Sequence, residues 1–165
     1  DLSEKEDQIL KEKCDKYKIT KGEISVGFEE FAQTLNENIN QFEFITFDYG
    51  DEYPRNDFST RIYNKHNVHP IFEDDLDLKN LYQKSDITYD VHFASLIDGF
   101  EASQIKKVQY TTQLKALVDF GIIDLLQMLL EHGDEENYLR EANKVKTLLT
   151  PTGMGDRFKM VHFRK

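Results

Sequence analysis

The sequence has little cysteine and proline and no tryptophan. Its 165 residues include one cysteine, Cys14, and three prolines. A single thiol cannot form an internal disulfide or a zinc site of several thiolates, so a reducing compartment is the simplest expectation. No apolar run approaches the roughly 20 residues that a membrane-spanning helix needs. The composition therefore excludes a disulfide-stabilised scaffold and predicts no membrane span.

Basic residues are scarce relative to acidic ones. The chain has 21 Lys and Arg against 31 Asp and Glu, which gives a net charge of −10 with His neutral. General nucleic-acid binding is not expected, because affinity for phosphates depends on clustered Lys and Arg. Most of the acidic excess should lie on a solvated surface, and a weaker interpretation is that it attracts a cationic substrate such as a guanidinium.

Several motifs that carry chemistry are also missing. The sequence contains no Walker A segment, no G-x-G-x-x-G and no G-x-S-x-G, so it predicts neither a nucleotide-binding loop nor a hydrolase. Gly153-Met154-Gly155 leads into a strand and predicts a turn with positive φ. His66 and His69, followed by three aspartates, have a spacing common in polar loops, so no metal site is predicted.

The eight Tyr and twelve Phe recur at regular spacing, which argues against disorder and favours one folded domain. Ser3-Glu4-Lys5-Glu6 predicts a capping box that starts a helix reaching Lys21-Gly22. Apolar residues at helical spacing predict further helices over 28–40 and 93–103. From Thr112 three helices are expected, interrupted at Gly121 and separated by Gly133, with Asp134 capping the last.

Strands are predicted where aromatic and β-branched residues gather. The expected strands cover 23–26, 42–47, 86–91, 108–111 and 158–163, and residues 51–85 are expected to form a long loop. Because an amphipathic helix precedes the strand at 42–47, a buried parallel strand is favoured there. The predicted class is therefore α/β.

Asp48 and Tyr49 directly follow the strand at 42–47, which is expected to stop at Asp48-Tyr49-Gly50. Ligands gather at the carboxyl ends of parallel strands, so Asp48 is the strongest single candidate for a functional carboxylate. The alternative is that Asp48 only caps the following turn. Asp86, Asp90 and His92 form a second cluster, which can equally be strand surface with His92 at a helix N-terminus.

A series of short motifs resembles the C-terminal half of the MidA-like, S-adenosylmethionine-dependent methyltransferases. The order and spacing of the series carry the resemblance, which is strongest over residues 43–163. The motifs are Asp48-Tyr49-Gly50, Arg61, Lys65-His66, Asp86-Ile87-Thr88, Val91, Phe93, Thr112-Gln113, Gly121-Ile122, Leu149-Thr150-Pro151, Met154-Gly155 and Phe158-Lys159. This family includes the mitochondrial complex I assembly factor that methylates an arginine of a core subunit.

The resemblance implies the C-terminal part of a class I, Rossmann-like methyltransferase fold. Residues 44–47 would be the fifth strand, and 108–111 and 158–163 the last two, with the three helices inserted between them and an antiparallel strand near the end of the sheet. Residues 1–165 would form one partial domain, the C-terminal half of the methyltransferase domain. The Gly-rich loop that binds the cofactor would lie upstream, so this chain alone is not expected to bind S-adenosylmethionine.

The resemblance also implies a function: methyl transfer to an arginine of a protein substrate, a subunit of complex I type. Asp48 and Tyr49 would be catalytic, and six residues would bind substrate: Arg61, Lys65, His66, Asp86, Thr88 and Gln113. The location would be cytoplasmic in a bacterium and the mitochondrial matrix in a eukaryote. An exposed sheet edge at 44–47 predicts self-association.

Two points leave alternatives open. The family reads His-Val-Asp-Phe where this chain has Asp90-Val91-His92-Phe93, so the acid and the imidazole have exchanged places. The second function compatible with the sequence is a non-catalytic docking or assembly module for a respiratory-complex subunit. An intact Gly-rich loop upstream would favour the enzyme, and a degenerate one the docking module.

Overall fold

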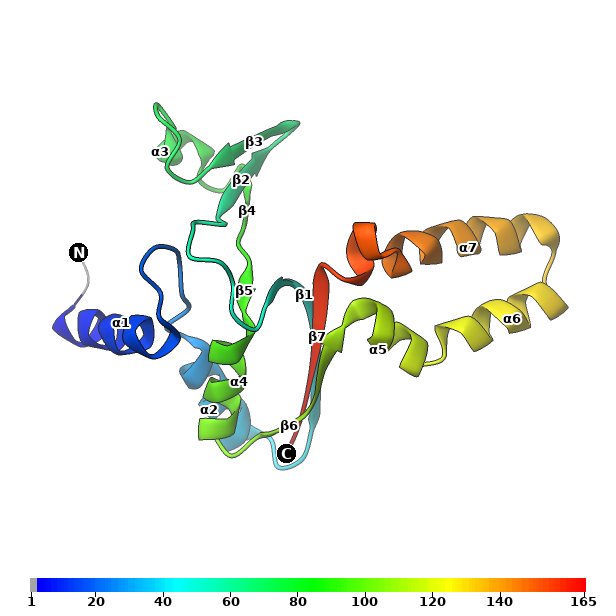
Figure 1. Cartoon of the computed structure of the whole chain (residues 1–165), viewed down its shortest axis with the longest axis horizontal. Coiled ribbons are helices and arrows are strands. Elements are labelled where there is room, and N and C mark those ends of the chain that lie inside the picture. The colour runs from blue at the N-terminus through cyan, green and yellow to red at the C-terminus, as the bar shows by residue number, and fades with distance from the viewer. Residues whose placement is uncertain (1–2) are drawn as a thin grey trace. The chain divides into compact units, whose positions relative to one another are not determined.

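The computed structural model describes residues 3–165, which form two compact units (Figure 1). The first unit contains residues 3–38 and 50–103, and the second contains residues 39–49 and 104–165. The chain passes between the units three times: after helix α2 (Phe28–Asn38), within strand β1 (Glu43–Asp51) and after helix α4 (Phe93–Ala102). Each unit combines helices with strands, so the mixed α/β class is confirmed.

Helix α1 (Glu4–Tyr17) starts at the predicted capping box. The Ser3 N–H donates to the Glu6 carboxylate at 2.8 Å, and the Glu6 N–H donates to Ser3 Oγ at 3.3 Å. This reciprocal pair satisfies two of the donors that a helix start leaves open. The helix ends earlier than predicted, because Lys18 adopts the left-handed conformation with φ 56°.

Helices α2 (Phe28–Asn38) and α4 build the core of the first unit. A Cβ on Gly99 of α4 would lie 3.2 Å from the Phe28 carbonyl carbon, so the two helices approach closely there. The Phe31 and Phe100 rings meet edge to face at 6.0 Å. The buried residues of α4 cover most of its length: Phe93, Ala94, Ser95, Leu96, Ile97, Gly99 and Phe100.

The first unit also contains a three-stranded antiparallel sheet in the segment expected to be a loop. Strand β2 (Arg61–Asn64) lies between β3 (Asn67–Pro70) and β4 (Asp86–Thr88), and the short helix α3 (Leu78–Leu81) lies between β3 and β4 in the chain. The loop prediction for 51–85 is therefore wrong over β2, β3 and α3, whereas β4 lies within the strand predicted at 86–91. The strand predicted at 23–26 is also absent, and Glu23 instead accepts hydrogen bonds from the N–H and hydroxyl of Ser59.

Strand β1 continues past the point where it was predicted to stop. Gly50, with φ 145°, and Asp51 extend it, and they pair in parallel with β5 (Val91–His92). A Cβ on Gly50 would lie only 2.2 Å from the Val91 carbonyl oxygen, so this approach of two backbones requires glycine. Asp48 and Tyr49 therefore lie inside a strand and do not begin a turn.

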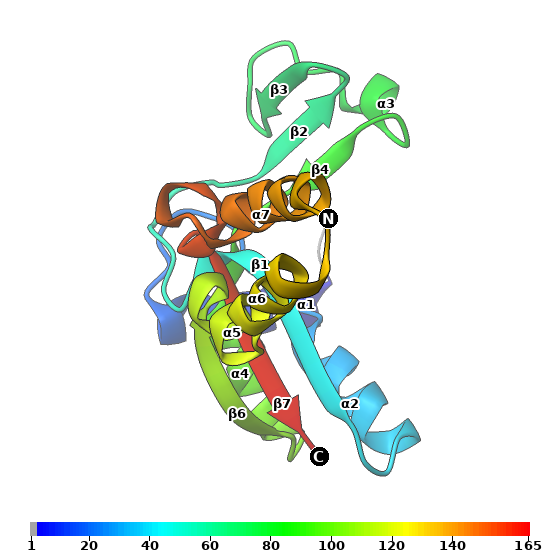
Figure 2. The same cartoon turned by 90° about the vertical axis from the view of Figure 1, so that its right-hand side faces the viewer.

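The second unit has a sheet with β7 (Phe158–Arg164) at its centre. Strand β7 runs antiparallel to β1, from Glu43↔Arg164 to Tyr49↔Phe158, and antiparallel to β6 (Lys106–Thr112). Strands β1 and β6 consequently point the same way on either side of β7 (Figure 2). The antiparallel terminal strands are confirmed. The prediction of a parallel, buried strand at 42–47 is wrong for the described residues. From Glu43 on, this stretch pairs antiparallel with β7, and its side chains are exposed or half-buried.

Three helices are inserted between β6 and β7, as expected: α5 (Gln113–Asp119), α6 (Ile122–His132) and α7 (Glu135–Leu149). Gly121, with φ 86°, separates the first two, and the Asp134 carboxylate caps α7 by accepting from the Asn137 N–H at 2.8 Å. The π-helical turn η1 (Pro151–Gly155) then leads to β7. A positive φ was predicted there and is wrong, because Gly153 has φ −91° and neither of its glycines is among the positive-φ positions.

Candidate functional site

Asp48 and Tyr49 lie on β1 near the end of the sheet in the second unit. The Tyr49 ring meets the Phe158 ring edge to face at 5.5 Å, which fixes the aromatic side chain against β7. The Tyr49 N–H donates to Asp48 Oδ1 at 2.8 Å. The Asp48 carboxylate is half-buried and serves as a local acceptor within the strand. A turn-capping role for Asp48 does not fit this position.

The register of the sheet places Gln113, the third predicted site residue of this unit, near the same end as Asp48 and Tyr49. Asp48 is opposite Lys159 of β7, and Lys159 is opposite Thr112 of β6, so the three residues form a row across the sheet. Neighbouring strands are about 4.8 Å apart, so the row spans roughly 10 Å. Gln113 follows Thr112 directly, is 5% exposed, and donates from Nε2 to the Leu148 carbonyl at 2.9 Å. Gln113 thereby holds the end of α7 against the start of α5.

The sheet of the first unit brings three of the predicted substrate-binding residues onto one face. Arg61 of β2 is directly opposite Thr88 of β4, and Tyr63, two residues further along β2, is opposite Asp86. Side chains directly opposite each other, and those two residues apart along a strand, share a face. Val68 of β3 is opposite Tyr63 and joins the same face. This face combines a guanidinium, a carboxylate, a hydroxyl and exposed apolar surface.

Lys65 and His66 lie at the tip of the β2–β3 hairpin. Asn64 and Asn67 are paired, so Lys65 and His66 form a two-residue connection, and Lys65 has φ 57°. Two-residue hairpins need residues with positive φ, which a lysine adopts only at some cost. Both side chains are exposed. The predicted substrate residues of the first unit are thus divided between a sheet face and a hairpin tip.

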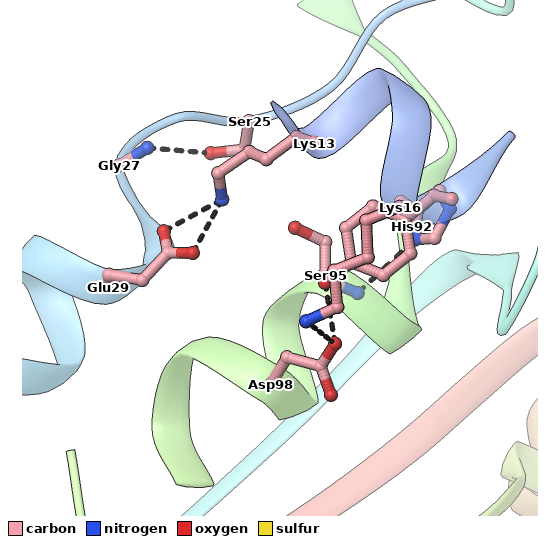
Figure 3. Close-up of polar contacts among 9 residues, drawn as sticks. Lys13, Lys16, Ser25, Gly27, Glu29, His92, Ser95 and Asp98 are labelled. Carbon is pink, nitrogen blue, oxygen red and sulfur yellow. Dashed lines mark hydrogen bonds and ion pairs between the residues drawn. The ribbon is translucent and has the colours of Figure 1, made fainter. Parts of the chain in front are cut away.

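A polar cluster that the sequence did not predict joins α1 to α4 (Figure 3). The Asp98 carboxylate accepts a hydrogen bond from the Tyr17 hydroxyl at 2.6 Å and forms an ion pair with Lys16 Nζ at 2.7 Å. His92 caps α4, because its Nδ1 accepts from the Ser95 N–H at 3.2 Å, and its ring centroid lies 4.6 Å from that of Tyr17. The neutral imidazole must therefore carry its proton on Nε2.

The environment of this cluster shifts the pKa of each group. Burial lowers the pKa of His92, so the ring is neutral near pH 7. Burial raises the pKa of Tyr17, and the hydrogen bond to Asp98 adds to this. Burial opposes ionisation of Asp98, but the hydrogen bonds from Lys16 and Tyr17 outweigh it and lower the pKa of that carboxyl. The charge-assisted contacts of Asp98 with Lys16 and Tyr17 hold the last turn of α1 against α4.

His92 and Asp90 make different contacts at the start of α4. His92 occupies the N-cap of α4 and accepts the hydrogen bond that a cap provides, so the interpretation of His92 as a helix N-terminal residue is confirmed. Aspartate is also a preferred N-cap residue. Asp90 is held by a different contact, since its N–H donates to Ser59 Oγ at 2.8 Å. His92 therefore supplies the cap of α4.

His92→Asn is expected to reduce the loss of stability that occurs as the pH falls from about 7 toward 5. Below the ordinary histidine pKa the unfolded chain takes up a proton that the folded His92 resists, so the free energy of unfolding falls as the pH drops from about 7 toward 5. Asparagine can still cap α4 but does not titrate. Urea titrations at several pH values check this. Parallel wild-type and variant profiles, differing only by a constant, would contradict the expectation.

Residues 3–165 contain neither a metal-ion cluster nor a membrane-spanning helix. No group of three or more His, Cys, Asp or Glu side chains in this part of the chain is arranged to hold a metal ion. None of the helices described there is both long enough and apolar enough to cross a bilayer.

The fold is similar to those of two solved structures of COG1565 superfamily proteins from Burkholderia thailandensis. The first, an uncharacterized protein, has a TM-score of 0.74 and 23% identity, and the match covers 87% of this chain and 38% of that one. The second, for which methyl transferase activity has been suggested, is bound to S-adenosyl-homocysteine; it has a TM-score of 0.73 and 23% identity, with 87% and 37% coverage. The chain thus spans less than two fifths of their length. No protein-family model matches the sequence, and no curated protein matches it significantly.

Proposed function

We propose that this chain is the C-terminal, substrate-side part of an S-adenosylmethionine-dependent methyltransferase that acts on a protein arginine. The observation that carries the proposal is the fold match over 87% of the chain to a protein bound to S-adenosyl-homocysteine. This molecule is what remains of S-adenosylmethionine once its methyl group has been transferred. The MidA-like motif order in residues 43–163 is a second, independent line of support.

The described residues do not fit a complete cofactor site. Two strands in residues 3–165 lead directly into helices, β5 into α4 and β6 into α5, and neither junction contains glycine. Each helix start is capped by a side chain of the chain itself, His92 in α4 and Thr112 in α5. A cofactor loop needs glycines and open backbone N–H groups at such a junction. The chain therefore fits the acceptor side of the reaction.

The role proposed for this chain's residues is to bind and orient a guanidinium. When bound to the longer enzyme, S-adenosylmethionine supplies the methyl group. The Asp48 carboxylate can accept hydrogen bonds from two guanidinium N–H groups, which fixes the plane of the acceptor. The acceptor nitrogen gives up one proton as it gains the methyl group, so the guanidinium and its methylated product carry the same charge. Tyr49, held by Phe158, would limit where the guanidinium can lie. In the first unit, the face with Arg61, Asp86 and Thr88 and the hairpin tip with Lys65 and His66 would bind other parts of the protein substrate. Gln113, which was predicted to bind substrate, would instead position the end of α7, because its buried side chain donates to the Leu148 carbonyl.

The isolated chain is expected not to bind S-adenosylmethionine, because neither direct strand–helix junction in residues 3–165 contains glycine. Isothermal titration of the 165-residue chain checks this, with the longer protein as the positive control. Micromolar binding by the isolated chain would mean that a cofactor site lies within these residues. The function itself is tested by transfer of a radiolabelled methyl group from the longer protein to an arginine-containing protein substrate.

The chain is also expected to self-associate through β1. In residues 3–165 no second strand pairs with β1 along 43–49, and such an edge can pair with another chain. Light scattering at rising concentration should show an increase in mean mass, which Ile45→Lys should reduce because a lysine on an edge strand opposes pairing. Ile45 is 43% exposed, so the variant should still fold. A monomer at millimolar concentration would contradict this expectation.

A docking or assembly module remains the second candidate. The large exposed apolar side chains of α6, such as Leu125 and Met128, favour it, because they are typical of a protein-binding surface. The two candidates differ in one measurement. A longer protein with no methyl transfer and no S-adenosylmethionine binding would be a docking module, and one with both activities would be an enzyme.

A further inference from the structure

Helix α6 is apolar on more sides than its neighbours cover. Ile122, Leu126 and Leu129 are half-buried and share one face, and α6 packs against α7 and α5. Leu125 and Met128 lie on an adjacent side and are 63% and 57% exposed. A helix that is apolar over so wide an arc is normally covered on that arc. The hairpin of α6 and α7 extends away from the β1–β7–β6 sheet of its own unit (Figure 1), so that sheet does not cover this side.

Apart from His132 in its last turn, the ionisable residues of α6 are acidic. Its eleven residues include Asp124 and Glu131, both exposed, and no Lys or Arg. Asp124 precedes Met128 by four residues and Glu131 follows it by three, so both carboxylates adjoin Met128 on the helix surface. Glu135 and Glu136 continue the negative charge into the first turn of α7. The exposed apolar side is thus bordered by negative charge.

The exposed apolar side of α6 and its acidic border together limit which kind of molecule can bind there. A second copy docked through α6 would bring two acidic borders together, so local repulsion opposes a symmetric pair at this helix. An anionic membrane surface would repel the same residues. A cationic amphipathic helix satisfies both features, because its apolar stripe covers Leu125 and Met128 while its Lys or Arg residues pair with Asp124 and Glu131.

We infer that α6 is the docking face for an amphipathic helix of a partner protein, with an apolar stripe flanked by Lys or Arg. Contact side chains of this kind allow helix axes to approach within 8–10 Å. Met128 suits such a face because its unbranched side chain adapts to different partners. The inference does not depend on methyl transfer, so failure of the proposed enzyme function would leave it standing.

The test uses a fluorescent 18-residue helical peptide with leucines at helical spacing and flanking lysines. Anisotropy should show binding to the chain in the range of about 10–100 μM at low salt, weakened about tenfold at 0.5 M salt because the charge pairs are exposed. A peptide with glutamates in place of the lysines, and one with serines in place of the leucines, should not bind. Both controls separate the apolar and the electrostatic contributions.

The matched variants truncate exposed side chains on two sides of the same helix. Leu125→Ala with Met128→Ala should weaken peptide binding at least tenfold, and Ile123→Ala with Leu130→Ala should change it less than twofold. All four residues are 50–63% exposed, and alanine preserves helix propensity, so both pairs should keep the fold, which circular dichroism checks. Asp124→Lys with Glu131→Lys should reverse the preference toward the glutamate peptide.

Three outcomes would overturn the inference. Equal binding of the lysine and glutamate peptides would remove the charge argument, and an unaffected Leu125→Ala/Met128→Ala pair would place the peptide elsewhere. A rise in mass with concentration that this pair abolishes would identify a second copy as the occupant. Binding to the 165-residue chain but not to the longer protein would show that another part of that protein covers α6.

Discussion

Replacing Gly50 with alanine is expected to destabilise the first unit by about 3 kcal/mol or more. Gly50 has φ 145°, a conformation that residues with a Cβ rarely adopt. A Cβ there would lie 2.2 Å from the Val91 carbonyl oxygen and 2.6 Å from the Val91 nitrogen. Both atoms belong to the backbone of β5, so they cannot move aside without breaking the parallel pairing of β1 with β5. Chemical denaturation measures the loss.

Gly27→Ala is the matched control. Apart from Gly27 itself and its two neighbours in the chain, no atom lies within 4 Å of the position that a Cβ on Gly27 would take, and its φ is not in the positive range. Its free energy of unfolding should stay within about 0.5 kcal/mol of the wild type. If both variants unfold like the wild type, β1 and β5 do not approach as closely as described. If both lose stability equally, the effect does not arise from the pairing at Gly50.

Helices were well predicted because their signals are local. The capping box of Ser3 and Glu6, the apolar spacing of α4 and the Asp134 cap of α7 each depend on residues within one or two turns. A periodic pattern together with a cap also fixes where a helix starts. The three inserted helices were therefore placed with their breaks at Gly121 and Gly133.

Strand pairing was harder to predict because its partners are distant in sequence. The segment 51–85 contains Arg61-Ile62-Tyr63 and Val68, whose alternation around a two-residue connection is typical of a hairpin, but the connection is Lys65-His66 and contains no glycine. The hairpin was not predicted because its connection lacks the glycine-containing pair that usually marks a two-residue hairpin. Glu23–Val26 has the alternation of a strand, yet Glu23 bonds with Ser59, 36 residues away.

The candidate site shows the same difference between local signals, which the sequence reveals, and contacts between distant residues, which it does not. The sequence proposed Arg61, Asp86 and Thr88 as substrate residues, and only the register of β2 with β4 shows that they share a face. The cluster around Asp98 was missed because Tyr17 is 81 residues away and no local pattern links them. A weak signal did exist, since Tyr17 lies on the apolar face of an otherwise highly charged helix. The role of Arg61, Asp86 and Thr88 in binding substrate stays a prediction.

Asp48→Asn in the longer enzyme is expected to reduce methyl transfer on the order of a hundredfold while the protein still folds. An ionised carboxylate can hold a guanidinium through two charge-assisted hydrogen bonds, and a neutral amide cannot. The fold should survive because Asn can accept the Tyr49 N–H hydrogen bond that Asp48 Oδ1 now accepts at 2.8 Å. A radiolabelled methyl-transfer assay with saturating protein substrate, run beside a thermal melt, measures both effects.

Asp51→Asn separates a catalytic role from a local one. Asp51 lies three residues further along the same strand, and its Oδ1 accepts from the Glu52 N–H at 2.8 Å, the same geometry as Asp48 with Tyr49. If the carboxylate of Asp48 binds the acceptor arginine, only Asp48→Asn should lose activity. Normal turnover and an unchanged melt for Asp48→Asn would make it a structural residue, and a lowered melting temperature for Asp48→Asn alone would show that its charge serves the fold instead.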